Sequence, residues 1–269
     1  MDSVLSAANI MQRLSLQDRA CLITGAGSGI GRAIAHAVAD AGGRVALIDM
    51  NEENTKVIQA EILERNPNTQ TTVLVADVTD PKQVSDVVDA AAKELGGLDV
   101  AYNNVGVGQW IDALDMPYED FQRMFRINVD SVFLGAVAQA KIMKKKNYGK
   151  IINTASISGY IANHPQSQAH YNASKSAVMG LTRSLAVEWV QHGVRVNSFS
   201  PTYTKTKLVE NFLETDEGRQ MYPTWVEMTP MRAMADPTDL QGAAVFLGSA
   251  ASDFMTGTDI VIDGGYLSF

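Results

Sequence analysis

The sequence predicts a doubly wound α/β fold, with one parallel seven-stranded sheet covered by helices on both faces. Seven short apolar runs alternate with longer segments whose apolar residues recur at helical spacing. Runs such as 45–48, Val-Ala-Leu-Ile, are apolar without alternation, which is typical of strands buried on both faces. The length of 269 residues suits one large domain of this class.

The strands and helices are expected in strict alternation. The expected strands are Ala20–Thr24, Arg44–Asp49, Thr71–Val75, Leu98–Tyr102, Lys150–Asn153, Val194–Ser198 and Ile260–Ile262. The expected helices are Gly31–Ala41, Glu52–Arg65, Pro81–Leu95, Phe121–Lys146, Tyr171–Gln191 and Asp239–Leu247. One long irregular stretch covers about residues 201–237, and such a loop usually has a function. We expect a single domain over 1–269, with an N-terminal extension at 1–17 and a substrate loop or lid at 201–237.

Composition excludes several classes of protein. Apolar residues make up 46% and charged residues 19%, as in globular proteins, and the net charge of −8 argues against nucleic acid as a partner. The basic run Lys144–Lys146 is interpreted as a solvated helix end. Cys21 is the single cysteine, so no intrachain disulfide can form, and it is expected to pack in the core. No signal-like or membrane-spanning apolar run occurs, which predicts a cytoplasmic protein without membrane contact.

A glycine-rich segment, Thr-Gly-Ala-Gly-Ser-Gly-Ile-Gly at 24–31, follows the first strand and opens directly into a helix. Glycines let the backbone turn tightly and approach a pyrophosphate, which the positive end of the helix stabilises. A purely structural turn is the alternative, but the strand before and the helix after favour a Rossmann-like dinucleotide site. The expected contacts are Gly25, Ser28, Gly29, Ile30 and Gly31.

Asp49 ends the second strand, where a carboxylate can accept hydrogen bonds from both hydroxyls of the adenosine ribose. The same charge would repel the 2′-phosphate of NADP, and neither Met50 nor Asn51 is basic, so NAD is the predicted cofactor. A role for Asp49 as the N-cap of the next helix is the alternative, and it does not exclude the ribose role. Further cofactor contacts are expected at the carboxyl edge of the sheet, from Asp77, Val78, Asn104 and Gly106.

Tyr171 and Lys175 are four residues apart, which places them on one face of a helix. The ordinary pKa of tyrosine is about 10, so a phenolate near neutral pH needs nearby positive charge. Lys175 and an oxidised nicotinamide are the expected sources. The phenolate would take the alcohol proton as hydride leaves carbon, and the reverse reaction would return it. An incidental pair on an amphipathic helix is the alternative interpretation.

These motifs together resemble the short-chain dehydrogenase/reductase family over about Leu16 to Leu267. The segments that carry the resemblance are TGAGSGIG at 24–31, NNVG at 103–106, INV at 127–129, INTAS at 152–156, YNASK at 171–175, VRVNSFSP at 194–201 and TGTDIVIDGGY at 256–266. By this resemblance Tyr171 is the catalytic acid/base, and Lys175 lowers its pKa and contacts the nicotinamide ribose. Ser156 would polarise the substrate oxygen, and Asn128 would support a proton-relay water.

The resemblance also has consequences for the nicotinamide end and for assembly. It places Pro201, Thr204 and Thr206 at the cofactor, although Thr202 replaces the glycine that usually follows this proline. The family's serine often lies thirteen residues before the tyrosine, which would select Ser158, so Ser158 remains the alternative to Ser156. The long helices 121–146 and 171–191 usually pack between subunits in the family, which implies a homotetramer, with a dimer as the second possibility.

Three segments resemble the branch that acts on polyols and ketoses, such as sorbitol, arabinitol or galactitol dehydrogenases: 163–166, 188–189 and 225–231. The polar residues Asn163, His164, Gln166 and Gln109 are candidates to bind substrate hydroxyls, or are ordinary loop residues. Bulky residues in the stretch 201–237 would instead cover an apolar ketone or form a lid; they are Tyr203, Phe212, Met221, Tyr222 and Trp225.

No metal site is expected, because the four histidines show no ligand spacing. Two rival functions stay open. One is a carbonyl reductase for an apolar ketone or acyl substrate, which would ordinarily use NADP. The other is a regulator that senses nicotinamide without turning it over, since a fold alone does not establish chemistry.

Overall fold

The computed structural model describes residues 9–268, in which seven parallel strands form one sheet in the order β3-β2-β1-β4-β5-β6-β7. The chain runs outward from β1 to β3, returns to the other side of β1 at β4, and continues outward to β7. The strand order therefore reverses between β1 and β4, and open α/β sheets bind ligands at such a switch point. The predicted fold class is confirmed.

The strands lie close to their predicted positions. β1 (Ala20–Thr24), β2 (Arg44–Asp49) and β3 (Thr71–Val75) match the predicted runs. The others differ at their ends: β4 (Val100–Asn103), β5 (Gly149–Thr154), β6 (Val194–Pro201) and β7 (Asp259–Ile262). The additions to β5 and β6 pair with neighbouring strands, as Thr154 does with Phe199 and Pro201 with Ile262. Such pairing depends on tertiary contacts.

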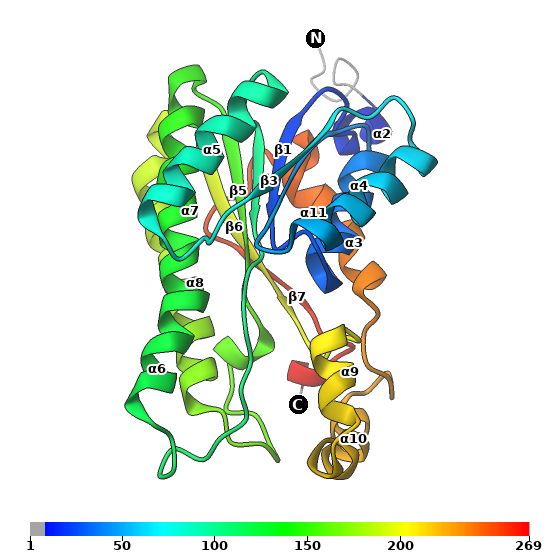
Figure 1. The fold of residues 1–269 in the computed structure, drawn as a ribbon, viewed down its shortest axis with the longest axis vertical. Coiled ribbons are helices and arrows are strands. Elements are labelled where there is room, and N and C mark those ends of the chain that lie inside the picture. The colour runs from blue at the N-terminus through cyan, green and yellow to red at the C-terminus, as the bar shows by residue number, and fades with distance from the viewer. Residues whose placement is uncertain (1–8, 269) are drawn as a thin grey trace.

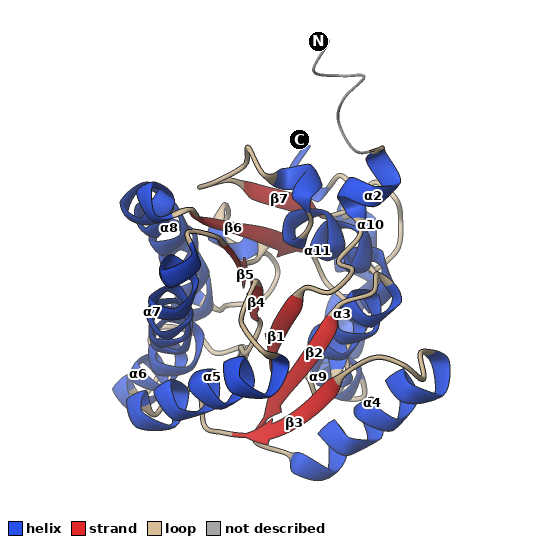
Figure 2. Ribbon diagram, turned by 90° about the horizontal axis from the view of Figure 1, so that it is seen from above, coloured by secondary structure: helices blue, strands red, loops and turns tan. Residues whose placement is uncertain are grey.

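Two layers of helices enclose the sheet (Figures 1 and 2). One layer contains α5 (Pro81–Leu95), α7 (Ser131–Met143) and α8 (Ala169–Trp189), and the other contains α3 (Gly29–Asp40), α4 (Glu52–Arg65) and α11 (Gln241–Gly248). Successive strand residues point to opposite layers, so Leu22 packs in one core and Ile23 in the other. This arrangement explains why these strands are apolar throughout.

The predicted single helix over Phe121–Lys146 is interrupted. The structure has α6 (Tyr118–Phe125), a π-helical turn η1 (Arg126–Asp130), α7, and a final 3₁₀ turn over Lys144–Lys146. A π turn contains an extra residue and occurs frequently at functional sites. This one contains Asn128. The three lysines are exposed at the helix end, as expected.

The stretch 201–237 is not irregular, and that prediction is wrong. It contains α9 (Lys207–Leu213) and α10 (Asp216–Met228), which lie beyond the carboxyl ends of the strands in Figure 1. The hydroxyl of Thr215 caps α10 by accepting a hydrogen bond from the Gly218 N–H at 3.0 Å. The shortness of α9 and the presence of Pro223 inside α10 hide this helical structure from pattern analysis.

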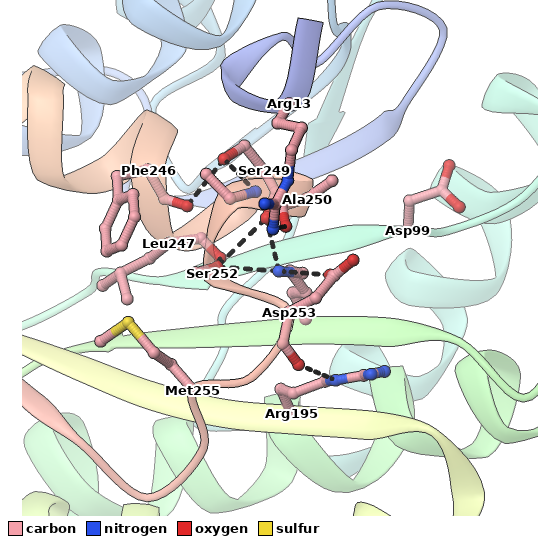
Figure 3. A network of polar contacts seen from close by, with 12 residues as sticks. Arg13, Asp99, Arg195, Phe246, Leu247, Ser249, Ala250, Ser252, Asp253 and Met255 are labelled. Carbon is pink, nitrogen blue, oxygen red and sulfur yellow. Dashed lines mark hydrogen bonds and ion pairs between the residues drawn. The ribbon is translucent and has the colours of Figure 1, made fainter. Parts of the chain in front are cut away.

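A buried lysine, Lys150, lies near the start of β5, away from the carboxyl ends of the strands. Lys150 in β5 is 1% exposed, and its Nζ donates to Ser252 Oγ at 2.8 Å and pairs with Asp253 Oδ1 at 2.9 Å. Figure 3 shows Ser249, Ser252 and Asp253 grouped there, with the Arg195 guanidinium bonded to the Asp253 carbonyl. Burial lowers the pKa of Lys150, and the Asp253 carboxylate opposes that change. The network ties β5 to the turn after α11.

Residues 1–8 of the expected N-terminal extension lie outside the described residues. The remainder packs on the domain: α2 (Ile10–Leu14) begins at an Asn9 cap, and Leu16 is fully buried. Cys21 is buried in β1, as expected. Within residues 9–268, no helix is long and apolar enough to cross a membrane. In the same range no group of three His, Cys, Asp or Glu side chains is arranged to hold a metal ion.

Candidate active site

A cavity of about 640 Å³ opens at the carboxyl ends of the strands. Its volume lies in the usual range for ligand pockets. Gly31 and Asn128 are buried and lie outside the lining. All the other predicted cofactor and catalytic residues line it: Gly25, Ser28, Gly29, Ile30, Asp49, Asp77, Val78, Asn104, Gly106, Ser156, Tyr171, Lys175, Pro201, Thr204 and Thr206.

The turn between β1 and α3 requires glycine. Gly25 and Gly29 have φ values of +67° and +52°, where a side chain is strained. A Cβ on Gly31 would lie 2.0 Å from the Gly25 carbonyl oxygen, so only glycine lets α3 begin this close to β1. The first N–H groups of α3 have no partner within the helix and suit a phosphate group. This cradle fits a dinucleotide pyrophosphate.

Asp49 is held at the cavity wall by two backbone groups. Its Oδ2 accepts a hydrogen bond from the Gly27 N–H and its Oδ1 accepts one from the Asn51 N–H, each at 3.0 Å. The N-cap of α4 is Asn51, whose side chain accepts from the Asn54 N–H at 2.9 Å, so the alternative of Asp49 as the N-cap is wrong. Each carboxylate oxygen of Asp49 keeps a further lone pair for a ribose hydroxyl.

Asn104 and Asp77 hold the turns that form the middle of the wall. The Asn104 N–H donates to Thr24 Oγ1 at 3.0 Å, and its Oδ1 accepts from Thr154 Oγ1 at 3.2 Å, which connects the ends of β1, β4 and β5. Asp77 Oδ1 accepts from both the N–H and the hydroxyl of Thr79, at 2.8 and 2.7 Å. Both residues therefore shape the wall, whatever cofactor contacts they make.

Lys175 and Tyr171 lie close together on α8, as their spacing predicts. Lys175 Nζ is 5.7 Å from the centroid of the Tyr171 ring and donates to the Thr154 carbonyl at 2.9 Å. Burial lowers the pKa of Lys175 to about 8. Burial also raises the pKa of Tyr171, and hydrogen bonding with the Ser156 hydroxyl opposes that rise. With protein groups alone the pKa of Tyr171 rises, so a phenolate requires added positive charge at this wall.

The geometry favours Ser156 over Ser158 as the serine that acts with Tyr171. Ser156 follows β5 and caps a short 3₁₀ turn, with its Oγ accepting from the Ser158 N–H at 3.1 Å. Its hydroxyl makes the contact with Tyr171. Ser158 also lines the cavity, but its Oγ accepts from Gln168 Nε2 at 3.2 Å. Ser158 is therefore placed as a second hydroxyl further along the wall.

Asn128 fixes the loop after β4 against α8. Its Oδ1 accepts from the Val107 N–H at 2.8 Å, and its Nδ2 donates to the Val107 carbonyl at 3.0 Å and to Ser174 Oγ at 3.1 Å. A Cβ on Gly106 would lie 3.4 Å from both Asn128 Oδ1 and Lys175 Nζ, so these groups flank the loop. The predicted support of a relay water stays a prediction.

Of the four polar residues expected to face substrate, only Asn163 lines the cavity. Gln109 donates to Asp120 Oδ2 at 2.8 Å, and its Oε1 lies 3.1 Å from His170 Nε2. His164 is exposed. Gln166 is 3% exposed and lies outside the lining.

The lining also contains polar residues that the sequence patterns do not single out as substrate ligands, and two of them belong to the hydrogen-bond network around Asn163. They are Gln168, which precedes the first residue of α8, and Tyr203, which the patterns place among the bulky apolar residues. Gln168 lies three residues before Tyr171, which is a weak signal for a shared helical face. The polar role of Tyr203 depends on partners distant in sequence and leaves no local signal.

A cluster of stacked aromatic rings stands beside the cavity on the side of α9 and α10, and two of its rings, Trp110 and Tyr203, line the cavity. Trp110 stacks on Phe212 at 3.9 Å between centroids, and Tyr203 stacks on Trp225 at 4.2 Å. Trp110 belongs to the loop after β4 and the other three to the segment after β6, so the cluster joins two parts of the chain. Of the five bulky residues predicted in this stretch only Tyr203 lines the cavity; Phe212, Met221, Tyr222 and Trp225 lie outside the lining. The covering role of residues 201–237 stays a prediction.

The start of the stretch 201–237 approaches the glycine-rich turn. A Cβ on Gly29 would lie 3.2 Å from the Thr206 methyl group. Thr204 Oγ1 donates to the Thr202 carbonyl at 2.9 Å, which orders the chain just before α9. Thr202 has no positive φ, so its backbone does not require the glycine that is usual in the family.

Comparisons with known proteins agree with this geometry. A family model described as enoyl-(acyl carrier protein) reductase matches residues 25–267. Galactitol 2-dehydrogenase of Rhizobium johnstonii is 39% identical, over 95% of this chain and 97% of its own. A short-chain type dehydrogenase/reductase from Mycobacterium marinum is 42% identical, with a TM-score of 0.91 and coverage of 96% and 99%. NADPH-dependent 3-quinuclidinone reductase from Rhodotorula rubra is 32% identical, with a TM-score of 0.89 and coverage of 98% and 96%.

Proposed function

The chain belongs to the short-chain dehydrogenase/reductase family, and from this premise we propose that it is an NAD-dependent dehydrogenase of polyols. The protein is an oxidoreductase that acts on alcohol groups. The observation that carries the finer proposal is one cavity lined both by the Asp49 carboxylate and by Ser156, Tyr171 and Lys175. The reaction would interconvert a secondary alcohol of a polyol and the ketone of a ketose.

In this proposal the residues of α8 and β5 handle the proton. Tyr171 takes the hydroxyl proton of the alcohol during oxidation and returns it during reduction. Ser156 donates to the substrate oxygen, and the buried Lys175 adds positive charge beside the phenol, which favours the phenolate. When bound, nicotinamide accepts the hydride from the alcohol carbon or returns it. Asn128 holds the loop after β4 in place through its two bonds with Val107.

The preference for NAD rests on the charge at Asp49. A carboxylate that lines the cavity favours a ribose with free hydroxyls and opposes a 2′-phosphate. Met50 follows it and is uncharged. On the α3 side, the Arg32 guanidinium already pairs with Glu61 at 2.9 Å.

The preference for a polyol rests on the polar part of the wall. Ser156, Ser158, Asn163 and Gln168 line the cavity together. A site with buried hydrogen-bonding groups rejects substrates that lack matching oxygens, because those groups then lose water without gaining a partner. The similarity to galactitol 2-dehydrogenase supports the same substrate class.

A specific observation favours one rival function, that of a carbonyl reductase for an apolar ketone. The aromatic rings of Trp110 and Tyr203 in the cavity lining suit an apolar ketone, and the chain resembles an NADPH-dependent quinuclidinone reductase. The charge of Asp49 opposes the cofactor of that reductase.

We propose further that the protein is a cytoplasmic homotetramer. Apolar side chains are exposed along α7 and α8 and just beyond: Phe133 is 45% exposed, Val187 78% and Val190 51%. Exposed apolar patches on helices frequently mark subunit contacts. Light scattering after gel filtration tests this: a mass four times 29.1 kDa is expected, and a monomer would contradict it.

The function is tested by initial rates of NAD and NADP reduction at alkaline pH over hexitols, pentitols and apolar secondary alcohols. Fast NAD reduction with one or two polyols is the expected result. Activity only with apolar alcohols would support the carbonyl reductase instead, and activity only with NADP would overturn the cofactor assignment. NADH binding without turnover of any substrate would support a nicotinamide-sensing regulator.

A further inference from the structure

We propose that Tyr203 is a specificity-determining residue whose hydroxyl donates a hydrogen bond to a second oxygen of the substrate, beyond the reacting carbon. This inference rests on the proposed polyol function and deepens it. Its basis is a chain of hydrogen bonds whose direction is set at Trp225 and ends at the cavity wall.

The direction is set by an indole. Trp225 is fully buried, and its Nε1–H lies 2.9 Å from Gln166 Oε1. An indole N–H only donates, so the amide of Gln166 must present its oxygen to Trp225 and its nitrogen elsewhere. That nitrogen lies 2.7 Å from the Tyr203 hydroxyl and 3.3 Å from Gln168 Oε1. Tyr203 and Gln168 both accept from Gln166.

A second branch reaches Tyr203 through Gln168. Because the oxygen of Gln168 accepts from Gln166, its nitrogen faces three acceptors: Asn172 Oδ1 at 2.7 Å, Asn163 Oδ1 at 3.0 Å and Ser158 Oγ at 3.2 Å. The nitrogen of Asn163 is thereby directed to the Tyr203 hydroxyl, at 3.2 Å. Two amide nitrogens from different residues therefore point at one phenol oxygen.

The Tyr203 oxygen then has no lone pair left for a substrate donor. The two amide contacts lower the pKa of Tyr203 against the rise caused by burial, and the neighbouring Tyr266 hydroxyl donates to Met228 Sδ at 3.5 Å. The Tyr203 ring is held by stacking on Trp225 at 4.2 Å and 7°. The hydroxyl hydrogen remains to be donated, and because Tyr203 lines the cavity we assign it to an acceptor on the substrate.

The donor role of the Tyr203 hydroxyl determines which substrate groups it can bind. A hydrogen-bond donor in the wall requires an acceptor, which an unreacted hydroxyl of a polyol or ketose supplies and a plain alkyl chain does not. Tyr203 and Tyr171 line the same cavity. Tyr203 is therefore placed to bind an oxygen of a substrate whose reacting hydroxyl lies at Tyr171.

The test compares two probes that differ by one hydroxyl, 2,3-butanediol and 2-butanol, with wild type and Tyr203→Phe. The ratio of kcat/KM for the diol to that for the alcohol is expected to fall at least 10-fold in the variant, mainly through a higher KM for the diol. Tyr222→Phe is the matched control, because Tyr222 lies on α10 and is 40% exposed. The control should leave the ratio unchanged.

A second variant reverses the direction of the network without removing the phenol. Gln166→Glu replaces the amide nitrogen by an acceptor, to which the Tyr203 hydroxyl then donates. The diol preference should fall as it does in Tyr203→Phe, while NADH binding measured by fluorescence stays within twofold of wild type. Unchanged NADH binding shows that this variant is folded.

The outcomes separate this inference from the proposed function. If the best polyol of the wider panel keeps its wild-type KM with Tyr203→Phe, the role of Tyr203 is wrong although the polyol function stands. The KM of the best polyol also tests the role of Tyr203 if 2,3-butanediol and 2-butanol react too slowly to be measured. If wild type oxidises no polyol, the proposed function fails, and the inference fails with it.

Discussion

The backbone N–H of Gly27 donates to Asp49 Oδ2 at 3.0 Å, so the glycine-rich turn and the end of β2 are fixed to each other. A Cβ on Gly27 would lie only 3.0 Å from the same oxygen. The absence of a side chain at Gly27 thus lets the carboxylate approach the turn. The group that would select the cofactor and the turn that would hold its phosphates form one unit.

Asp49→Ser is expected to lower the preference for NAD over NADP at least 10-fold, because the charge that opposes a 2′-phosphate is removed. The measurement is kcat/KM for each cofactor with the best polyol. Glu53→Gln is the control, since Glu53 is an exposed carboxylate in the first turn of α4. A wild-type preference for NADP would contradict the assigned role of Asp49.

Tyr171→Phe is expected to lower kcat by about 10²–10⁴-fold, the usual contribution of a positioned acid or base. The affinity for NADH should stay within a few-fold of wild type, since the ring is retained. Stopped-flow rates and NADH fluorescence titration give the two quantities. Tyr118→Phe, at a tyrosine that is 67% exposed, serves as the control. Turnover close to wild type in the Tyr171 variant would refute the proton role.

Lys175→Met should change how stability depends on pH. Burial lowers the pKa of Lys175 from 10.5 to about 8, so the folded protein bears the cost of a buried cation in full below pH 8. This cost disappears as the pH rises from about 8 to 10.5, where the unfolded chain also loses the proton. Wild type should therefore gain roughly 2 kcal/mol relative to the variant between pH 7 and pH 10.

Urea unfolding at several pH values measures this difference. Parallel curves for wild type and Lys175→Met would show that the lysine pKa is not lowered.

Asp253→Ala should destabilise the protein more than Lys150→Met does. Removing the carboxylate leaves the buried Lys150 ammonium without its ion-pair partner, whereas replacing the lysine removes the charge itself. Because Asp253 is 43% exposed at its side chain, a loss of about 1–3 kcal/mol is expected rather than the larger cost of a fully buried pair. Urea unfolding at pH 7 gives both losses, and the reverse order would contradict the account of this network.

Kinetics of the same two variants provide the control. The network lies at the edge of the sheet opposite the cavity, so kcat/KM should stay within twofold of wild type.

The parts of the fold that sequence predicts best are those set by local composition. The limits of β1 to β3 follow from apolar runs bounded by polar residues, and the catalytic pair follows from the four-residue spacing of Tyr171 and Lys175. The position of Asp49 in the cavity wall also follows from its place at the end of a strand. These features depend on the chain within a few residues of each position.

The parts that sequence misses depend on distant contacts. Nothing in the spacing of residues 126–130 distinguishes a π turn from an ordinary helix, since the turn is fixed by the bonds from Asn128 to Val107 and Ser174. Likewise, Gln166 is predicted as a candidate substrate ligand, but its amide oxygen accepts a hydrogen bond from Trp225, which lies 59 residues later in the sequence. The direction of a hydrogen-bond network cannot be read from residue types alone.

The π turn η1 also sets a limit on engineering this protein. Shortening this turn by one residue would restore ordinary helical hydrogen bonds through residues 126–130. Each residue removed from a helix rotates the rest of that helix by about 100°. Such a change would carry the buried Asn128 amide away from Val107, so the bonds that hold the loop after β4 would be lost together with the extra residue.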